Sequence, residues 1–281
     1  MGNTIQTMNI RGQLVDLAYP LVMGILNVTP DSFYAGSRCI DTDAIRRRVR
    51  TIRNEGASML DLGGYSSRPG ADDVSPAEEW QRLKPAIEIV REEWPEAIVS
   101  VDTFRADVAR RAVEAGVDII NDISGGNMDP EMFPTVADLH VPYILMHMQG
   151  TPKDMQQAPS YTDVMTEVFR SLGERVEQLH ELGVLDVILD PGFGFGKTLE
   201  QNYVMMSRLK EFSLLGCPIL VGVSRKSMIY RLLGTTPEQA LNGTTVLNTM
   251  ALMNGANILR VHDVREAVEA VNIYRKCLIS D

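Results

Sequence analysis

The stretch "ELGVLDVILDPG", residues 181–192, contains the unit from which the fold can be predicted. A glycine stands where a helix C-cap would be, and the apolar run that follows it ends in a carboxylate. The same plan occurs in "EGASMLDLGG" (55–64), "EAGVDIINDISG" (114–125), "LLGCPILVGVS" (214–224) and "MNGANILRVHD" (253–263). Continuous apolar strands that alternate with helices are typical of a parallel sheet covered on both faces.

Counting every apolar run of this kind predicts eight strands. They are residues 21–28, 59–64, 98–103, 119–124, 143–148, 187–192, 218–224 and 258–263. Apolar residues at helical spacing lie between the runs, as at Ile45, Val49 and Ile52. Eight such units in 281 residues predict an α/β fold, a single-domain (β/α)8 TIM barrel over residues 21–281 after a lead-in segment, residues 1–20. The alternative is an open doubly wound sheet, which more usually has fewer strands.

The composition excludes several classes of partner. With 27 basic and 37 acidic residues the net charge is −10, which argues against nucleic acid or an anionic membrane as the main partner. No apolar run is long enough to cross a bilayer, and the first residues show no export or lipid-anchor signal. The three cysteines are far apart without C-x-x-C spacing, which favours neither a disulfide framework nor a zinc site. A reduced, cytoplasmic setting is the simplest expectation.

The segment "DPGFGFGKT", residues 190–198, ends like a phosphate-binding loop but lacks its spacing. The Walker A pattern requires a glycine five residues before Gly196, where Pro191 stands without an N–H. The dinucleotide pattern G-x-G-x-x-G fails as well, because the three glycines are evenly spaced. A nucleotide hydrolase is therefore not predicted, and Lys197 and Thr198 are interpreted as the start of the sixth helix.

Polar residues end the predicted strands, and the C-terminal ends of barrel strands carry the active site. They are Asn27, Asp61, Asp102, Asn121, Asp122, His147, Asp190, Ser224, Arg225, Lys226, Arg260 and His262. One such residue alone is most simply a helix N-cap, but a rim that combines carboxylates, amides and cations indicates a site. Acceptors and amides suit a heterocycle with N–H donors, and arginines suit a phosphate-like anion. We expect a ligand with both parts, and a magnesium ion held by one protein oxygen and the phosphates.

Eight segments of the chain, in order from about residue 21, resemble dihydropteroate synthases. They are "NVTPDSF" (27–33), "DLGGYSSRPGA" (61–71), "SVDT" (100–103), "INDISGG" (120–126), "MHMQGTP" (146–152), "DPGFGFGKT" (190–198), "GVSRKS" (222–227) and "RVHDV" (260–264). The resemblance implies that the chain joins 7,8-dihydropterin-6-methyl diphosphate to 4-aminobenzoate and releases diphosphate, on the route to folate. Tyr65 stands where glutamate is more usual in the family, and Ser67 stands where threonine is common.

The resemblance also implies roles for single residues. Asn27 would hold Mg2+. The pterin would contact Asp102, Asn121, Asp190 and Lys226, and the diphosphate would contact Asn27, Ser67, Arg68, Arg260, Val261 and His262. The arylamine would lie between Pro69, Phe195 and Lys226, with Ser227 near its carboxylate and Phe33 closing the pocket. The catalytic candidates are Arg68, Lys226 and Asp31, and for Asp31 the alternative of a turn residue after Pro30 stays open.

The chemistry expected from this resemblance is an SN1-like displacement. Diphosphate is the leaving group, the electron-rich pterin stabilises the cation, and loops 27–37 and 64–71 exclude water. The alternative function is a pterin-binding domain of a corrinoid methyl-transfer system, which would need neither an arylamine pocket nor a diphosphate clamp. Because the family is usually dimeric, a homodimer is expected, with the last helices as the interface.

Overall fold

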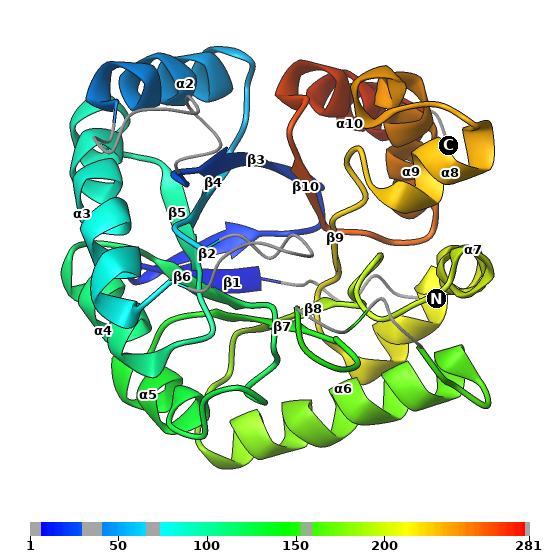
Figure 1. Cartoon of the computed structure of the whole chain (residues 1–281), viewed down its shortest axis with the longest axis horizontal. Helices are drawn as coiled ribbons and strands as arrows, with labels where there is room; N and C mark the ends of the chain where they lie inside the picture. The colour runs from blue at the N-terminus through cyan, green and yellow to red at the C-terminus, as the bar shows by residue number, and fades with distance from the viewer. Residues whose placement is uncertain (1–6, 30–40, 66–73, 153–154, 156–158, 279–281) are drawn as a thin grey trace.

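The computed structural model describes residues 7–29, 41–65, 74–152, 155 and 159–278 of the chain. Eight parallel strands form one sheet: β3 (Leu21–Asn27), β4 (Met59–Gly63), β5 (Ile98–Asp102), β6 (Ile119–Asp122), β7 (Tyr143–Met146), β8 (Val187–Asp190), β9 (Leu220–Val221) and β10 (Ile258–Val261). Their order is β8-β7-β6-β5-β4-β3-β10-β9, and a parallel bridge between Leu189 and Ile219 joins the two ends. The sheet thus closes into the predicted barrel (Figure 1).

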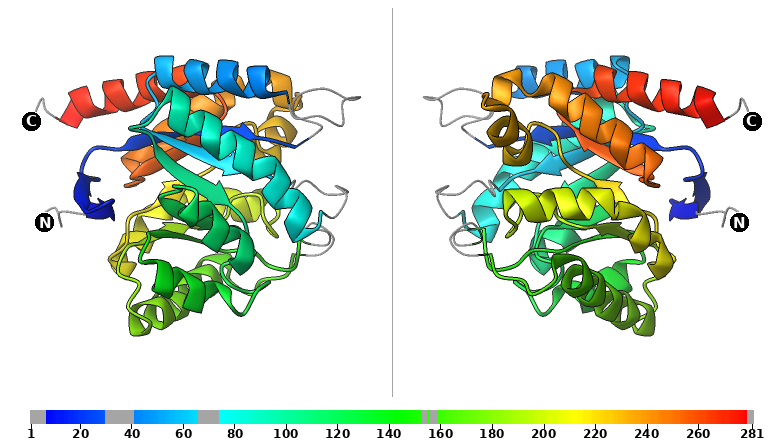
Figure 2. Two further views of the ribbon diagram at one scale, coloured as in Figure 1. Left: turned by 90° about the vertical axis from the view of Figure 1, so that its left-hand side faces the viewer. Right: turned by 90° about the vertical axis from the view of Figure 1, so that its right-hand side faces the viewer.

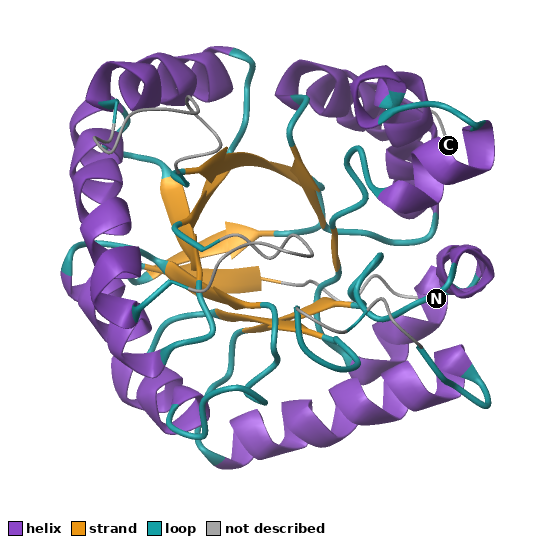
Figure 3. Ribbon diagram, in the orientation of Figure 1, coloured by secondary structure: helices purple, strands orange, loops and turns teal. Residues whose placement is uncertain are grey.

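Helices surround the strands on the outside, as Figure 3 shows. They are α2 (Thr42–Asn54), α3 (Pro76–Glu93), α4 (Ala106–Glu114), α5 (Met132–Leu139), α6 (Val164–Glu181), α7 (Leu199–Ser207), α8 (Ser227–Leu233), α9 (Leu241–Met253) and α10 (Val264–Leu278), with the 3-10 helices η1 (Leu209–Leu215) and η2 (Pro237–Gln239). The five glycines of the repeated plan follow α2, α4, α6, η1 and α9 with φ between +74° and +104°. That conformation ends a helix and favours glycine, so the pattern that predicted the fold has a steric cause.

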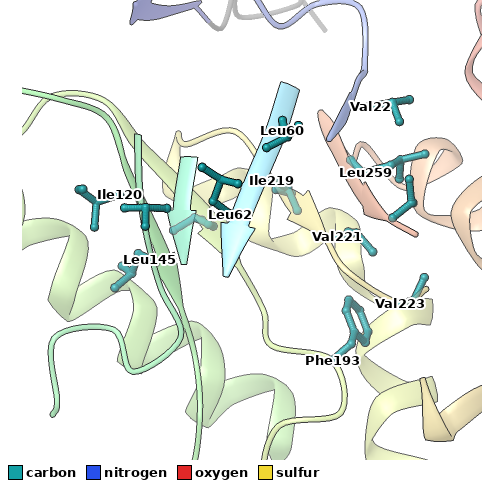
Figure 4. Close-up of a cluster of buried hydrophobic side chains, with 14 of the residues drawn as sticks. Val22, Leu60, Leu62, Ile120, Leu145, Phe193, Ile219, Val221, Val223 and Leu259 are labelled. Carbon is teal, nitrogen blue, oxygen red and sulfur yellow. The ribbon is translucent and has the colours of Figure 1, made fainter. Parts of the chain in front are cut away.

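The main hydrophobic core lies between the barrel and its helices. Outward-facing strand residues such as Leu60, Leu62 and Leu259 are buried there and appear in Figure 4. On the helix side, Ile45, Val49 and Ile52 of α2 are buried, as their spacing predicted. No described helix is long and apolar enough to cross a membrane.

The segment treated as a lead-in contains a β-hairpin, which the sequence analysis did not predict. β1 (Thr7–Ile10) and β2 (Gln13–Asp16) pair antiparallel through a two-residue turn, in which Arg11 and Gly12 have positive φ. Figure 2 shows the hairpin at the end of the barrel opposite to the direction of the strand arrows. β1 alternates exposed and buried residues over only four positions and β2 has no buried residue, so neither strand gives a clear signal in the sequence.

The hairpin covers one end of the barrel with apolar side chains. Met8, Ile10 and Leu17 pack against inward-facing residues near the starts of the barrel strands, among them Met59 and Ile119. Burying each such side chain contributes about 1.5–3 kcal/mol. The result is an apolar floor, above which the polar residues of the strands lie.

Candidate active site

The polar layer begins one pleat above the apolar floor, because residues two apart on a strand face the same side. Met59 belongs to the floor, and Asp61 on the same strand lies in the barrel interior, fully buried. Asp61 accepts hydrogen bonds from Arg260 Nε at 2.7 Å, from Asn121 Nδ2 at 3.1 Å and from the Ser100 hydroxyl. Four strands thus meet at one carboxylate.

Arg260 links this carboxylate to a second one. Its Nη2 donates to Asp102 Oδ2 at 2.9 Å, and Nη1 has no hydrogen-bond partner among the described residues. Burial lowers the pKa of Arg260, but Asp61 and Asp102 outweigh that effect and hold the pKa above its usual value. Burial raises the pKa of Asp102 to about 7, against the opposing effect of Arg260. A residue expected to bind pterin therefore contacts one expected to bind diphosphate.

Asp190 and Lys226 form the other half of the layer. Asp190 is buried at the end of β8, and its Oδ1 accepts the Gly192 N–H at 2.8 Å. Burial raises the pKa of Asp190, and Lys226 opposes that shift. Burial lowers the pKa of Lys226 to about 8, although Asp190 raises it, and Asp102 and Arg260 also act on Lys226 through their charges. Three of the four residues expected to bind pterin, Asp102, Asp190 and Lys226, are therefore close enough to influence one another.

Phe195 lies beside Lys226, as expected for an arylamine pocket. The Lys226 ammonium is 4.6 Å from the centroid of the Phe195 ring, and Nζ also donates to the Phe193 carbonyl at 2.6 Å. Phe195 is half-buried and packs against a small apolar cluster that includes Met146 and Met148, whereas Phe193 is fully buried in the main core. Phe195 is thus the aromatic residue of this loop that remains available to a ligand.

Lys197 differs from its interpretation as the start of a helix. It is only 3% exposed, and its Nζ donates to the carbonyls of Gly192 at 2.9 Å and Phe195 at 3.0 Å. Nζ also lies 3.1 Å from His147 Nδ1. Burial, then the charge of Lys197, lowers the pKa of His147 to about 2. Thr198 caps α7 through a capping box with Gln201, so the helix does begin there.

The loop that Lys197 holds also requires glycine. Gly192 has φ +73°, and a Cβ on it would lie 1.9 Å from the His147 carbonyl oxygen. The glycines of "DPGFGFG" therefore allow the loop to pack closely on the end of β7, and the lysine joins the carbonyl groups that this packing brings together. The sequence signal for this role is a lysine that directly follows three closely spaced glycines, Gly192, Gly194 and Gly196.

Three further residues of the expected diphosphate site lie at the ends of β3 and β10. The Asn27 amide oxygen would be 2.8 Å from a Cβ placed on Gly63, so that glycine leaves room for the amide. His262 has its Nδ1 3.1 Å from Ser224 Oγ, and burial, then Arg260, lowers its pKa to about 4. The Val261 side chain is buried in the main core, so only its backbone is available to a ligand.

Two polar residues at the rim have structural roles instead. Asp122 accepts hydrogen bonds from the Tyr143 hydroxyl at 2.7 Å and from the N–H groups of Ser124 and Gly126. Arg225 pairs with Asp263 through two bonds of 2.9 Å and donates to two carbonyls near η2. These contacts take both residues out of the candidate site.

Arg105, which the sequence pattern does not indicate, contacts both Tyr65 and Val74. Its guanidinium lies 5.5 Å from the ring centroid of Tyr65 and donates to the Val74 carbonyl at 2.5 Å. It also pairs with Glu79, which is fully buried. The expected residues Asp31, Phe33, Ser67, Arg68 and Pro69 lie outside the described residues. Among the described residues, no group of three His, Cys, Asp or Glu side chains could hold a metal ion.

Comparison with known proteins identifies the family. The family model "Pterin binding enzyme" matches residues 23–262. The dihydropteroate synthase of Escherichia coli strain K12 is 44% identical over 95% of this chain and 95% of its own length, and that of Bacillus subtilis strain 168 is 42% identical over 88% and 84%. Two solved dihydropteroate synthases, from Yersinia pestis with a sulfonamide drug and from Xanthomonas albilineans with 4-aminobenzoic acid, each superpose with a TM-score of 0.91 at 40% identity. They cover 98% of this chain, which spans 100% and 99% of theirs. The chain therefore belongs to the dihydropteroate synthase family of pterin-binding enzymes.

Proposed function

We propose that this chain condenses 7,8-dihydropterin-6-methyl diphosphate with 4-aminobenzoate to give 7,8-dihydropteroate and diphosphate. The observation that carries the proposal is the joined polar layer of Asp102, Asn121, Asp190, Arg260 and Lys226 in the barrel. It combines acceptors for a ring rich in N–H groups with cations for an anionic leaving group. The membership of the family and the 4-aminobenzoic acid bound to the Xanthomonas relative support the same substrates.

The pterin ring would lie above the apolar floor, against Asp102, Asn121 and Asp190. Carboxylates at two of these positions would accept the ring N–H groups, and Lys226 would donate to a ring acceptor. The arylamine would pack on Phe195 with its carboxylate near Ser227, which begins α8. Pro69 and Phe33 are proposed to complete this pocket.

The diphosphate would contact Arg260, His262, the backbone of Val261 and the hydroxyl and guanidinium of Ser67 and Arg68. Nη1 of Arg260 has no hydrogen-bond partner among the described residues, so it is the donor that is available to the diphosphate. Asn27 would hold the metal ion, and we propose Mg2+ because it accepts an amide oxygen and takes its other ligands from phosphates and water. When bound, this ion would neutralise part of the charge on the diphosphate.

The proposed reaction is an SN1-like displacement. The bond between the pterin methylene carbon and the diphosphate oxygen breaks with its electron pair on oxygen, and the resulting cation is stabilised by the pterin ring. The amine lone pair of 4-aminobenzoate then forms the new C–N bond, and the amine proton passes to water. Arg68 and Arg260 would stabilise the departing charge, Lys226 would fix the two rings, and Asp31 would face the cation.

The direct test supplies the purified protein with dihydropterin methyl diphosphate, Mg2+ and 4-aminobenzoate. We expect dihydropteroate and free diphosphate in equal amounts, measured by chromatography and a coupled phosphate assay. Binding of the pterin without condensation would instead identify a pterin-binding module. Omission of the metal should lower the rate, and Asn27→Ala should raise the Mg2+ concentration needed for half-maximal rate.

A homodimer is proposed for the surface formed by α9 and α10. Met253, Ile273 and Leu278 are 72%, 68% and 53% exposed there, beside an apolar cavity of about 740 Å3. Exposed apolar residues on adjacent helices are typical of an interface, and the occupant we propose is a second copy of this chain. Sedimentation velocity should report a dimer for the wild type. Ile273→Glu should sediment as a monomer that is still folded, as shown by a cooperative thermal transition.

A further inference from the structure

Asp61 is a buried acid at the junction of the two expected ligand sites, and the family resemblance implied no role for it. Its side chain is fully buried on β4, directly above the apolar floor. Three donors from β5, β6 and β10 converge on its two oxygens: Ser100, Asn121 and Arg260. A carboxylate shared in this way fixes the orientation of each donor.

The contact with Asn121 decides which way the amide faces. Its Nδ2 donates to Asp61 Oδ2 at 3.1 Å, so its Oδ1 points away from the carboxylate. The reversed amide would set an oxygen against the carboxylate, with no proton between them. Asp61 therefore makes Asn121 an acceptor toward the ligand, as a pterin N–H requires.

The contact with Asp61 decides which nitrogens of the Arg260 guanidinium are engaged within the protein and which one remains for a ligand. Nε donates to Asp61 Oδ2 at 2.7 Å, and Nη2 lies 2.5 Å from the same oxygen while it donates to Asp102 Oδ2 at 2.9 Å. A planar guanidinium held at two of its three nitrogens has one orientation, which leaves Nη1 for a further anion. Without the Asp61 carboxylate, as in Asp61→Asn, Arg260 would be free to turn its fork onto Asp102 alone and would occupy the carboxylate expected to bind pterin.

We propose that Asp61 is a positioning residue of the condensation, which orients Asn121 for the pterin and Arg260 for the diphosphate without touching either substrate. Ser100 supports it by holding the second carboxylate oxygen. The inference rests on the proposed function, because it names the substrates that the two oriented groups receive.

Asp118 provides a matched control. It too is a buried acid bonded to arginines, with Arg11 Nε at 2.7 Å and Arg91 Nη2 at 2.8 Å, and 6% of it is exposed. It contacts the hairpin at the floor end of the barrel, away from the polar layer. Loss of charge at Asp118 should therefore affect stability without affecting ligand recognition.

The test compares Asp61→Asn, Ser100→Ala and Asp118→Asn with the wild type by calorimetry. Dihydropterin methyl diphosphate and dihydropterin methanol, which lacks diphosphate, serve as ligands. Asp61→Asn disrupts the buried charge pair with Arg260, and its affinity for dihydropterin methyl diphosphate should therefore fall about 100-fold. The affinity of the variant for dihydropterin methanol should fall about tenfold, because this ligand depends on the orientation of Asn121 but not on that of Arg260. KM for 4-aminobenzoate should change by less than about twofold.

Two results would overturn the proposal. One is an affinity of Asp61→Asn within about twofold of wild type for both ligands. The other is an equal loss in Asp118→Asn, which would make the effect one of stability. If Asp61→Asn does not fold, Ser100→Ala decides: a loss of about fivefold or more for the diphosphate ligand supports the proposal, and no loss refutes it.

A spectroscopic measurement separates this proposal from the proposed function. The Nε–Hε resonance of Arg260, assigned with Arg260→Lys, should shift in Asp61→Asn and stay in place in Asp118→Asn. A resonance that does not shift in Asp61→Asn would contradict the pairing of Asp61 with Arg260. If the resonance shifts in Asp61→Asn but the wild-type protein forms no dihydropteroate, the proposed function is refuted while the pairing of Asp61 with Arg260 stands.

Discussion

Replacing Lys197 with methionine should change how stability depends on pH. Lys197 is buried against carbonyl groups of Gly192 and Phe195, and burial lowers its pKa from 10.5 to about 7, with Lys226 adding to the effect and Asp190 opposing it. Because the pKa in the folded protein lies below that of the unfolded chain, the unfolded chain binds more protons between these two values. The stability of the wild type should therefore rise with pH across that window and be lost as pH falls through about 7.

The size of the effect is set by the linkage between protonation and folding. One group contributes at most about 1.4 kcal/mol of unfolding free energy for each pH unit inside the window. Between pH 7 and 9, the difference between wild type and Lys197→Met should thus change by about 2–3 kcal/mol in favour of the wild type. Lys226 has a lowered pKa as well, but it is present in both proteins, so that only its charge coupling to Lys197 enters the difference.

The assay is urea unfolding at half-unit steps from pH 6 to 9, followed by circular dichroism. Lys210→Met, at an exposed lysine of η1, is the control and should give a curve parallel to that of the wild type. If Lys197→Met also runs parallel to the wild type, the ammonium is not held in the environment that its contacts describe, and the account of the glycine-rich loop fails.

Four further changes test the site and its support. Asp190→Asn should weaken binding of the dihydropterin by about 10- to 100-fold in calorimetry while the thermal midpoint is kept, and unchanged affinity would remove Asp190 from the pterin site. Arg260→Ala should weaken binding of the diphosphate ligand at least about tenfold more than binding of dihydropterin methanol, and equal losses would mean that the arginine acts structurally. Arg105→Met leaves the buried Glu79 without its cation and should lower stability by about 3–5 kcal/mol in urea unfolding, with part recovered by adding Glu79→Gln; a loss below about 1 kcal/mol would contradict this. Phe195→Ala should raise KM for 4-aminobenzoate and the inhibition constant of a sulfonamide together, and a change in only one would show that they bind different surfaces.

Much of the fold could be predicted because buried parallel strands appear in sequence as continuous apolar runs. Every predicted run contains one strand of the barrel, and most extend past it into the rim. The strand β9 is much shorter than its predicted run, residues 218–224, since Pro218 has no N–H to donate and Gly222 follows directly. The hairpin was missed because each of its strands shows only two buried positions or fewer.

The candidate site was harder to predict where a residue's role depends on what it meets across the barrel. The local motif around Lys197 indicates a helix start, whereas the partners of its ammonium include His147, which directly follows β7. Asp61 was noted only as a polar residue at a strand end, since nothing local shows that three other strands converge on it. Arg105 follows the end of β5 by three residues, and its contacts with Tyr65 and Val74 arise only in the folded barrel.

Strand parity nevertheless separates the polar residues that face the barrel interior from those that face outward. Five strands set a polar residue two positions after a residue that packs in the apolar floor: Met59 and Asp61, Ile98 and Ser100, Ile119 and Asn121, Ile188 and Asp190, Ile258 and Arg260. Since alternate residues face the same side, each polar member must lie inside the barrel, directly above the floor. Asp122 and Val261 have the opposite parity, and they do pack outward, against Tyr143 and in the main core. A floor residue followed two positions later by a polar one is thus a stronger sign of a group in the interior polar layer than a polar residue at a strand end, and it selects Asp61 together with Ser100, Asn121, Asp190 and Arg260.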